Sequence, residues 1–460
     1  KAAEKSDVDS DSGSFAAVKP FDGKYSPVWS DLPLFGKRNT GVSVVAVVAV
    51  GFAVFTMETG KAERRTRFKG GGTGVKIKNR LFLAATLCML LCLSGCMSSA
   101  ELKNRTIVKM VGVDAEGEEF ILTMLQFASK AESGEKTSES ETKIAQVRGK
   151  SISEAIGKVS QYTGNEVFLG NSGFLVIGKE AAEQGVERAL NFFNSNHEVS
   201  PELYIVMAKD KAEDVIRVQC EEGAATTQLK SLVEQGQKNG LLGSPTLRDV
   251  MNRLQSDCAE PYLPLVDIVK SKNGEKVIKI SGMAVCKDGK AKELLSVEEA
   301  RGVLWATDEL HRALLTVDFG EEKKSTASVE LGESKSRVKV HLKEGKPVLE
   351  LSIKSKGHLK EVNFDRGGGV KMEELKEIEN EVSSRIKSTA ERTIDKVLFR
   401  EKCDVFRYSE FIKKEEPDYW KKNEQRWDEV IDEMKIHVFV NCKIDHPGLE
   451  AKHHQVAEQR

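Results

Sequence analysis

The sequence predicts an α+β protein of several domains, with mixed and antiparallel β-sheets flanked by helices. Three observations lead to this prediction. Strands and helices follow one another as β-β-α-β-α-β-α in the first part of the chain. Short alternating strands then recur between residues 314 and 353, which is typical of an antiparallel meander. A long helix that begins at Met372 carries an apolar stripe, so we expect it to pack on that meander sheet.

The first part of the chain begins with a predicted β-hairpin, residues 107–113 and 120–127, joined by a turn. Residues 129–143 are polar and predict an exposed loop. Ser151, followed three residues later by Glu154, predicts the N-terminal cap of a helix. The remaining elements expected here are strands at 173–177 and 203–208 and helices at 179–193 and 212–220.

The middle of the chain, residues 221–257, has a polar helical pattern, and Pro261 and Pro264 predict an extended linker that ends near Asp267. Residues 277–286 alternate and lead into a hairpin turn, after which Ser296 is expected to cap a helix. The strands expected in the C-terminal part are 314–319, 327–331, 337–342, 348–353 and, after the long helix, 436–444.

Residues 75–96 have the composition of a secretory signal. Cations precede an apolar run of about fifteen residues, which is shorter than the ~20 that a membrane-spanning helix needs. The run ends in Leu93, Ser94, Gly95 and Cys96 and resembles a bacterial lipobox, in which the cysteine receives a diacylglycerol. We therefore expect Cys96 to be the lipidated N-terminus of the working protein. An uncleaved signal anchor or a buried core helix is the alternative.

The residues before this signal do not fit a secreted protein, because a secretory signal normally opens the chain. We expect residues 1–74 to be an extension that arises from a misassigned start, with the true start at Val75 or Met57. A short transmembrane helix at 42–57 is the rival interpretation. The predicted division is then 1–74 extension, 75–95 signal, 96–210 N-terminal α/β domain, 211–275 helical region and linker, 276–449 C-terminal α+β domain and 450–460 polar tail.

Composition gives no indication of catalysis or nucleic-acid binding. The 70 basic residues balance the 71 acidic ones, so no strong overall field would attract nucleic acid. Beyond the signal, the cysteines have no short-spaced pair, and the histidines lack an i,i+4 pair, so neither a disulfide framework nor a metal site is indicated. Glu298 and Glu299 could form an acid–base pair, but a capping or solvated role is favoured because neighbours on a helix point about 100° apart.

Two blocks of the sequence, 282–305 and 404–449, and further matches between residues 101 and 152 form a recognisable pattern. On these residues the chain, from Cys96 to about Leu449, resembles the C-subunit lipoproteins of spore germinant receptors, the Ger(x)C family. The residues of these blocks that we expect to be structural are Gly282, Glu299, Arg301, Gly302, Trp305, Asp404, Trp420 and Trp427. For the tryptophans, packing is favoured over a ligand-stacking site.

The resemblance implies a non-enzymatic subunit that acts in receptor assembly or signalling during germination. It implies a location on the outer face of the spore inner membrane, in complex with two integral membrane subunits of the A and B types. No cofactor is expected beyond the diacylglycerol and acyl chain on Cys96. The chain departs from the family at Met97-Ser98 and Asn171-Ser172. A solute-binding lipoprotein is the alternative, but the regular, similar lobes of such proteins are not evident in the sequence.

Overall fold

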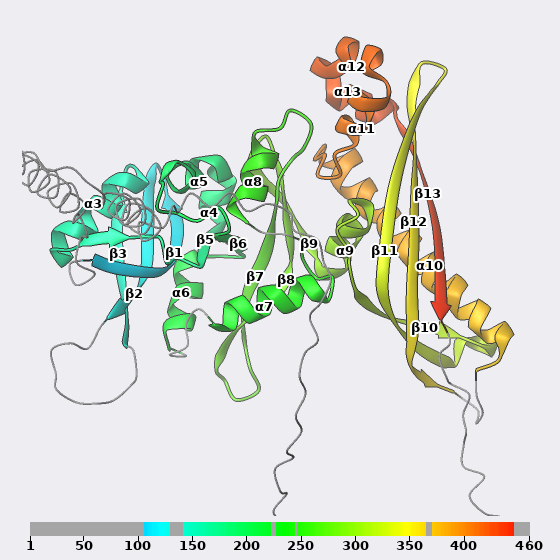
Figure 1. Ribbon diagram of the computed structural model, residues 1–460, viewed down its shortest axis with the longest axis horizontal. Helices are drawn as coiled ribbons and strands as arrows, with labels where there is room; N and C mark the ends of the chain where they lie inside the picture. Colours follow the sequence, from blue (N-terminus) through cyan, green and yellow to red (C-terminus); the bar gives the residue numbers. More distant parts are fainter. Residues whose placement is uncertain (1–104, 129–140, 222–226, 244–245, 365–369, 446–460) are drawn as a thin grey trace, which may run out of the picture. The chain divides into compact units, whose positions relative to one another are not determined.

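The computed structural model describes residues 105–128, 141–221, 227–243, 246–364 and 370–445. Within these ranges the strands form two sheets, a larger mixed one and a smaller one near the C-terminus (Figure 1). Helices flank both sheets, and the predicted α+β class is confirmed. The predicted lipobox, the predicted signal and the residues before it lie outside the described ranges.

The larger sheet has the strand order β3-β2-β1-β5-β6-β7-β8-β9, with β4 paired to β1, which makes nine strands among the described residues. The strands β1, β5, β6 and β7 are parallel neighbours, whereas the outer pairs on both sides are antiparallel. The strands are β1 (Arg105–Glu116), β2 (Glu119–Ala128), β3 (Glu141–Gly149), β4 (Glu166–Phe168), β5 (Phe174–Ile177), β6 (Tyr204–Ala208), β7 (Tyr262–Lys270), β8 (Lys276–Lys287) and β9 (Lys290–Ser296).

Apolar residues of this sheet point alternately into two separate clusters, so both faces are buried. On β5, for example, Leu175 joins one cluster and its neighbour Val176 joins the other. The first cluster includes side chains of α3 (Ile152–Thr163), α4 (Lys179–Gln184), α5 (Val186–Ser195) and α8 (Leu247–Leu254). The second includes side chains of α6 (Ala212–Glu221) and α7 (Thr227–Lys238). The result is three layers, as the continuous apolar runs of parallel strands require.

The predicted linker at Pro261 and Pro264 is instead the strand β7, paired with both of its neighbours. Proline lacks the N–H that a central ladder needs, so it normally argues against such a strand. Here the parallel pairing to β6 begins at Leu265, one residue after Pro264, which reduces the demand for that N–H. The loop predicted at residues 129–143 is wrong at its C-terminal end, because β3 already begins at Glu141 and pairs along β2. Whether domains divide at 210/211 and 275/276 stays a prediction.

The smaller sheet has the order β10-β11-β12-β13. The first three strands form the predicted antiparallel meander, and β13 adds to β12 in parallel. What were expected to be separate strands at 327–331 and 337–342 form one long strand with a register shift between Leu331 and Glu333. The strands are β10 (Ala313–Phe319), β11 (Ser325–Lys343), β12 (Lys346–Asn363) and β13 (Lys435–Asp445).

The long helix α10 (Met372–Ile394) lies along one face of this smaller sheet (Figure 1). Its Leu375, Ile378, Val382 and Ile386 share a core with Leu349, Leu351 and Ile353 of β12, as the apolar stripe predicts. A π-helical segment, Asp395–Arg400, continues α10. The remaining helices of this part are α9 (Val297–Ala306), α11 (Tyr408–Glu415), α12 (Pro417–Asn423) and α13 (Trp427–Glu433). The other face of the sheet carries mostly exposed polar side chains.

Candidate functional site

The two blocks of residues singled out in the sequence come together around α9 and the end of α10. Ser296 caps α9, because its hydroxyl accepts a hydrogen bond from the Glu299 backbone N–H while the Glu299 carboxylate accepts one from the Ser296 N–H. The cap at Ser296 was predicted and is confirmed, and Glu299 completes it as a capping box. The Glu299 carboxylate also pairs with Lys396 at 2.9 Å. Glu298 pairs instead with Arg385 and Arg392 of α10, so the two carboxylates do not act on a common point.

Gly282 and Gly302 are placed where a side chain would collide with its surroundings. The backbone of Gly282 has φ 141°, and an added Cβ would lie 1.8 Å from the Leu295 carbonyl oxygen on the neighbouring strand. At Gly302 an added Cβ would lie 2.3 Å from the Thr393 Oγ1 of α10. Both positions therefore serve close packing of backbones. Trp305, on the same helix as Gly302, is buried in the core between α9, α10 and the smaller sheet.

The side chain of Arg301, also on α9, contacts the segment after α7 and the strand β10. Its guanidinium donates hydrogen bonds to the Gly240 carbonyl after α7, at 3.3 Å, and to the Leu314 carbonyl of β10, at 3.5 Å. It therefore ties three backbone segments together.

Asp404 is a buried carboxylate at the start of α11. It accepts hydrogen bonds from the backbone N–H groups of Tyr408 at 3.0 Å and Ser409 at 2.8 Å, and so caps this helix. Burial raises the pKa of Asp404 above its ordinary value, although these hydrogen bonds oppose the rise. Trp420 and Trp427 follow, with ring centroids 5.5 Å apart in an edge-to-face arrangement. Trp420 is buried in the core, and Trp427 is partly buried against it.

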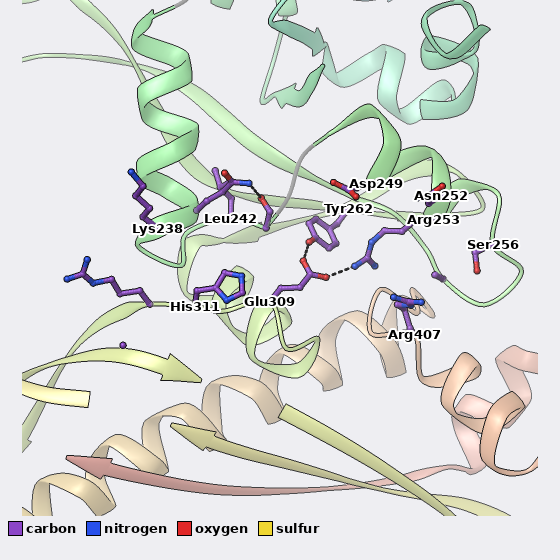
Figure 2. A pocket seen from close by; sticks show the side chains of 15 residues that line it. Lys238, Leu242, Asp249, Asn252, Arg253, Ser256, Tyr262, Glu309, His311 and Arg407 are labelled. Atoms are coloured by element: carbon purple, nitrogen blue, oxygen red, sulfur yellow. Dashed lines mark hydrogen bonds and ion pairs between the residues drawn. The ribbon is translucent and has the colours of Figure 1, made fainter. Parts of the chain in front are cut away.

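A cavity of about 840 Å³ lies near these residues, between α7, α8, β7 and the segment after α9 (Figure 2). Three of its side chains interact directly at its wall. The Glu309 carboxylate accepts hydrogen bonds from the Tyr262 hydroxyl and from Arg253, the latter at 2.6 Å. Arg253 also donates to the Val405 carbonyl at 3.0 Å, and its guanidinium lies 4.6 Å from the centre of the Tyr262 ring. Figure 2 shows Glu309 between the other two side chains.

The hydrogen-bonding groups of Arg253, Tyr262 and Glu309 are partnered within the cluster. The cluster is therefore poorly suited to acid–base catalysis. Burial, followed by the nearby Glu309 charge, raises the pKa of Tyr262 well above its ordinary value, so the hydroxyl stays protonated at neutral pH. Gly243 stands at the wall, where an added Cβ would lie 2.7 Å from a Glu309 carboxylate oxygen. Lys238, Arg312 and Arg407 give the rest of the wall a cationic character, but Arg312 and Arg407 pair with Glu330 and Glu410.

Sequence reasoning did not find Arg253, Tyr262 or Glu309. They lie on three segments separated by as many as 56 positions, and no short motif joins them. Pro261, the residue before Tyr262, predicted a linker, and a linker gives no reason to expect a buried functional side chain at Tyr262. The only signal was the isolated tyrosine within an otherwise apolar run, Tyr262 to Val266.

Metal ligands, reactive thiols and membrane-spanning helices were also considered among the described residues. No group of three or more His, Cys, Asp or Glu side chains in these ranges is arranged to hold a metal ion. The thiols of Cys258, Cys286, Cys403 and Cys442 are free and buried, and burial raises the pKa of Cys403 and of Cys442 to about 12. Helices long and apolar enough to cross a membrane do not occur in the described part of the chain.

Two family models match the chain, and several known proteins are similar to it. A family model described as the spore germination protein N-terminal domain matches residues 98–268, and one described as spore germination B3/GerAC-like, C-terminal, matches residues 281–448. Spore germination protein B3 of Bacillus subtilis is 24% identical over 369 residues, which cover 79% of this chain and 97% of that protein. Spore germination protein GerQC of Bacillus cereus is 22% identical over 377 residues, 80% of this chain and 98% of that protein. The crystal structure of the GerBC protein aligns with a TM-score of 0.49 and 19% identity, covering 73% of this chain and 97% of that one.

Proposed function

Because the chain belongs to the GerAC-like family of spore germination proteins, we propose that it is the C-type subunit of a germinant receptor. The observation that carries the proposal is the match of both family models, which together extend from residue 98 to residue 448. The proposed role is to assemble with A-type and B-type integral membrane subunits and to support signalling in germination. No reaction is proposed, since Glu309 at the cavity pairs with Arg253, and Glu299 and Asp404 cap helices elsewhere.

The proposal includes a lipid tether at Cys96. Leu93, Ser94 and Gly95 provide the lipobox, and the N-terminal family match begins at residue 98, two residues after the cysteine. The Cys96 thiol would receive a diacylglycerol and the new N-terminus an acyl chain. At ~0.8 kcal/mol per buried methylene, two or three chains suffice for stable anchoring, whereas one binds only marginally. The folded part would then lie on the outer face of the spore inner membrane.

Cys96→Ala tests the tether. The chain is produced in a sporulating bacterium that lacks the A-type and B-type subunits, and membrane and soluble fractions are compared by immunoblot. We expect the wild-type chain in the membrane fraction and the variant in the soluble fraction. Cys92→Ala is the matched control, since this cysteine lies within the apolar run of the signal and should have no effect. A Cys96→Ala protein that remains membrane-bound after a high-salt wash, which removes contacts made by surface charge alone, would contradict the tether.

The cavity beside Arg253 is the one observation that favours a second function, that of a solute-binding lipoprotein. Against it, the two sheets differ in strand number and topology, whereas solute-binding proteins close two similar lobes over their ligand. Purification from detergent-extracted membranes distinguishes the two. Co-purification with polytopic subunits supports the receptor role, and tight small-molecule binding without such partners supports the alternative.

A further inference from the structure

The exposed face of the smaller sheet carries a row of cations around one exposed aromatic side chain. We name this surface the basic sheet face. Its cations alternate along β11 and β12 with residues that point into the core, and its aromatic residue is on β13. The basic sheet face consists of Lys335, Arg337, Lys339, Lys354, Lys356 and Phe439, all of them exposed.

Strand register places these side chains next to one another. Lys335 lies directly opposite Lys354 in the antiparallel pair β11–β12. Ser352 lies between Arg337 on one side and Phe439 on the other, so the aromatic ring belongs to the same row as the guanidinium. Phe439 is 54% exposed, which makes it one of the few large apolar side chains of the described residues that face solvent.

Fold stability does not account for this arrangement. Like charges directly opposite on neighbouring strands are destabilising, and Lys335 and Lys354 are such a pair. In the described ranges none of the cations of the basic sheet face is in an ion pair, whereas Lys360 on the same strand pairs with Glu330. Glu333 lies opposite Lys356 and Glu350 lies opposite Lys339, but the other three cations, Lys335, Arg337 and Lys354, have no carboxylate opposite them on β11 or β12. An exposed phenylalanine also has an unfavourable contact with water.

We infer that the basic sheet face binds the anionic headgroups of a lipid bilayer, with Phe439 inserted at the boundary between headgroups and acyl chains. Cations that alternate along neighbouring strands lie on one sheet face, so several of them can meet a membrane surface at once. Lys and Arg near an anionic leaflet are attracted to it, and an aromatic side chain gains free energy by leaving water there. The inference rests on the proposed membrane location, and it adds a second, reversible contact to the lipid tether.

Vesicle binding by the full chain tests the inference. The Cys96→Ala background removes the lipid tether, so that binding no longer depends on the diacylglycerol. Vesicles of phosphatidylglycerol and phosphatidylcholine are compared with vesicles of phosphatidylcholine only, which measure any binding by the apolar N-terminal residues. Each cation near the surface contributes roughly fivefold in affinity, so Lys335→Gln together with Lys354→Gln should weaken binding to the anionic vesicles about 25-fold.

Matched variants separate this surface from net charge. Lys376→Gln together with Lys387→Gln changes the charge by the same amount on exposed positions of α10, the helix that covers the opposite face of the sheet, and should leave affinity unchanged. Lys335→Arg together with Lys354→Arg keeps the charge and should bind like the parent. Phe439→Ser should weaken binding without changing its dependence on salt, whereas the glutamine pair should reduce that dependence.

If the glutamine pairs on the basic sheet face and on α10 lost the same affinity for anionic vesicles, the effect would be one of net charge and the inference would be overturned. The inference would also be overturned if neither pair lost affinity. Binding to a polyanion such as heparin without binding to anionic vesicles would overturn the assignment to lipid. Because the background lacks Cys96, failure here is independent of the fractionation experiment that tests the tether.

Discussion

The two sheets of this protein bury different numbers of faces. In the larger sheet, neighbouring residues of one strand enter two separate cores, and helices cover both sides. In the smaller sheet, only one side packs, against α10 and the helices near it, while the other carries charge. A strand with two buried faces must be apolar throughout, whereas one with a single buried face alternates. The difference shows which surface of the chain the packing leaves available for contacts with a partner or a membrane.

Matched truncations on one strand of each sheet give the largest expected difference. On β2, Leu122 and Leu125 are both fully buried, in different cores. Replacing either by Ala should lower the free energy of unfolding by about 2–5 kcal/mol. On β12, at the same spacing, Leu351→Ala should cost a similar amount, but Lys354→Ala should change it by less than about 0.5 kcal/mol.

Urea unfolding of the four variants measures these values. A large loss in Lys354→Ala would show that the exposed face is covered in the native protein. A negligible loss in Leu125→Ala would remove the distinction between the sheets.

The contact between α9 and α10 gives the next effect. Gly302→Ala places a Cβ 2.3 Å from Thr393 Oγ1 and 2.7 Å from Thr393 Cβ, so a helix must shift, at a cost of about 1–3 kcal/mol. Gly157→Ala, in helix α3 beside the larger sheet, meets nothing within 4 Å and should stabilise by about 0.4–1 kcal/mol. Thermal unfolding should therefore shift in opposite directions. A shift in the same direction would mean that α9 does not pack so closely on α10.

The link between Arg253 and Glu309 should show energetic coupling. Arg253→Met leaves the partly buried Glu309 carboxylate without its cation, and the expected loss is about 1–3 kcal/mol. Glu309→Gln should be less costly, because the amide can still accept from the Tyr262 hydroxyl. In a double-mutant cycle the two changes should be non-additive. Strict additivity would indicate that the two side chains do not interact in solution.

In one respect the two parts should behave alike. Asp114 caps α6 beside the larger sheet as Asp404 caps α11 near the smaller one. Burial raises the pKa of both carboxyls. Each group then holds its proton more tightly when folded than when unfolded, so its contribution to stability is present at low pH and is lost as pH rises through the folded-state pKa.

The stability of the wild type relative to Asp404→Asn should therefore fall as pH rises above about 4, and the same should hold for Asp114→Asn. Urea unfolding at a series of pH values measures this difference, which should be small. If the stability of the wild type relative to either variant rose with pH, this would contradict the direction assigned to the pKa.

Regular periodicity accounts for what could be predicted from the sequence. The stripe Leu375, Ile378 and Val382 predicted the packing of α10, and Ser296 predicted the N-terminal cap of α9. The strand β7 was missed because its prolines argue against a strand and because one of its partners, β6, lies far away in the chain, although the other, β8, follows directly. Arg253 and Glu309 were missed for the same reason, since their contact exists only after folding. The basic sheet face needed the register of three strands, which alternation alone does not fix.

The most direct test of the proposed lipid-tethered subunit is the mass of its N-terminal peptide. The protein is extracted from spore inner membranes, digested and examined by mass spectrometry. The proposal predicts a peptide that begins at Cys96 and carries a diacylglycerol and an acyl chain, with no peptide from residues 75–95. An unmodified Cys96 within a peptide that continues from residues before it would contradict the proposal.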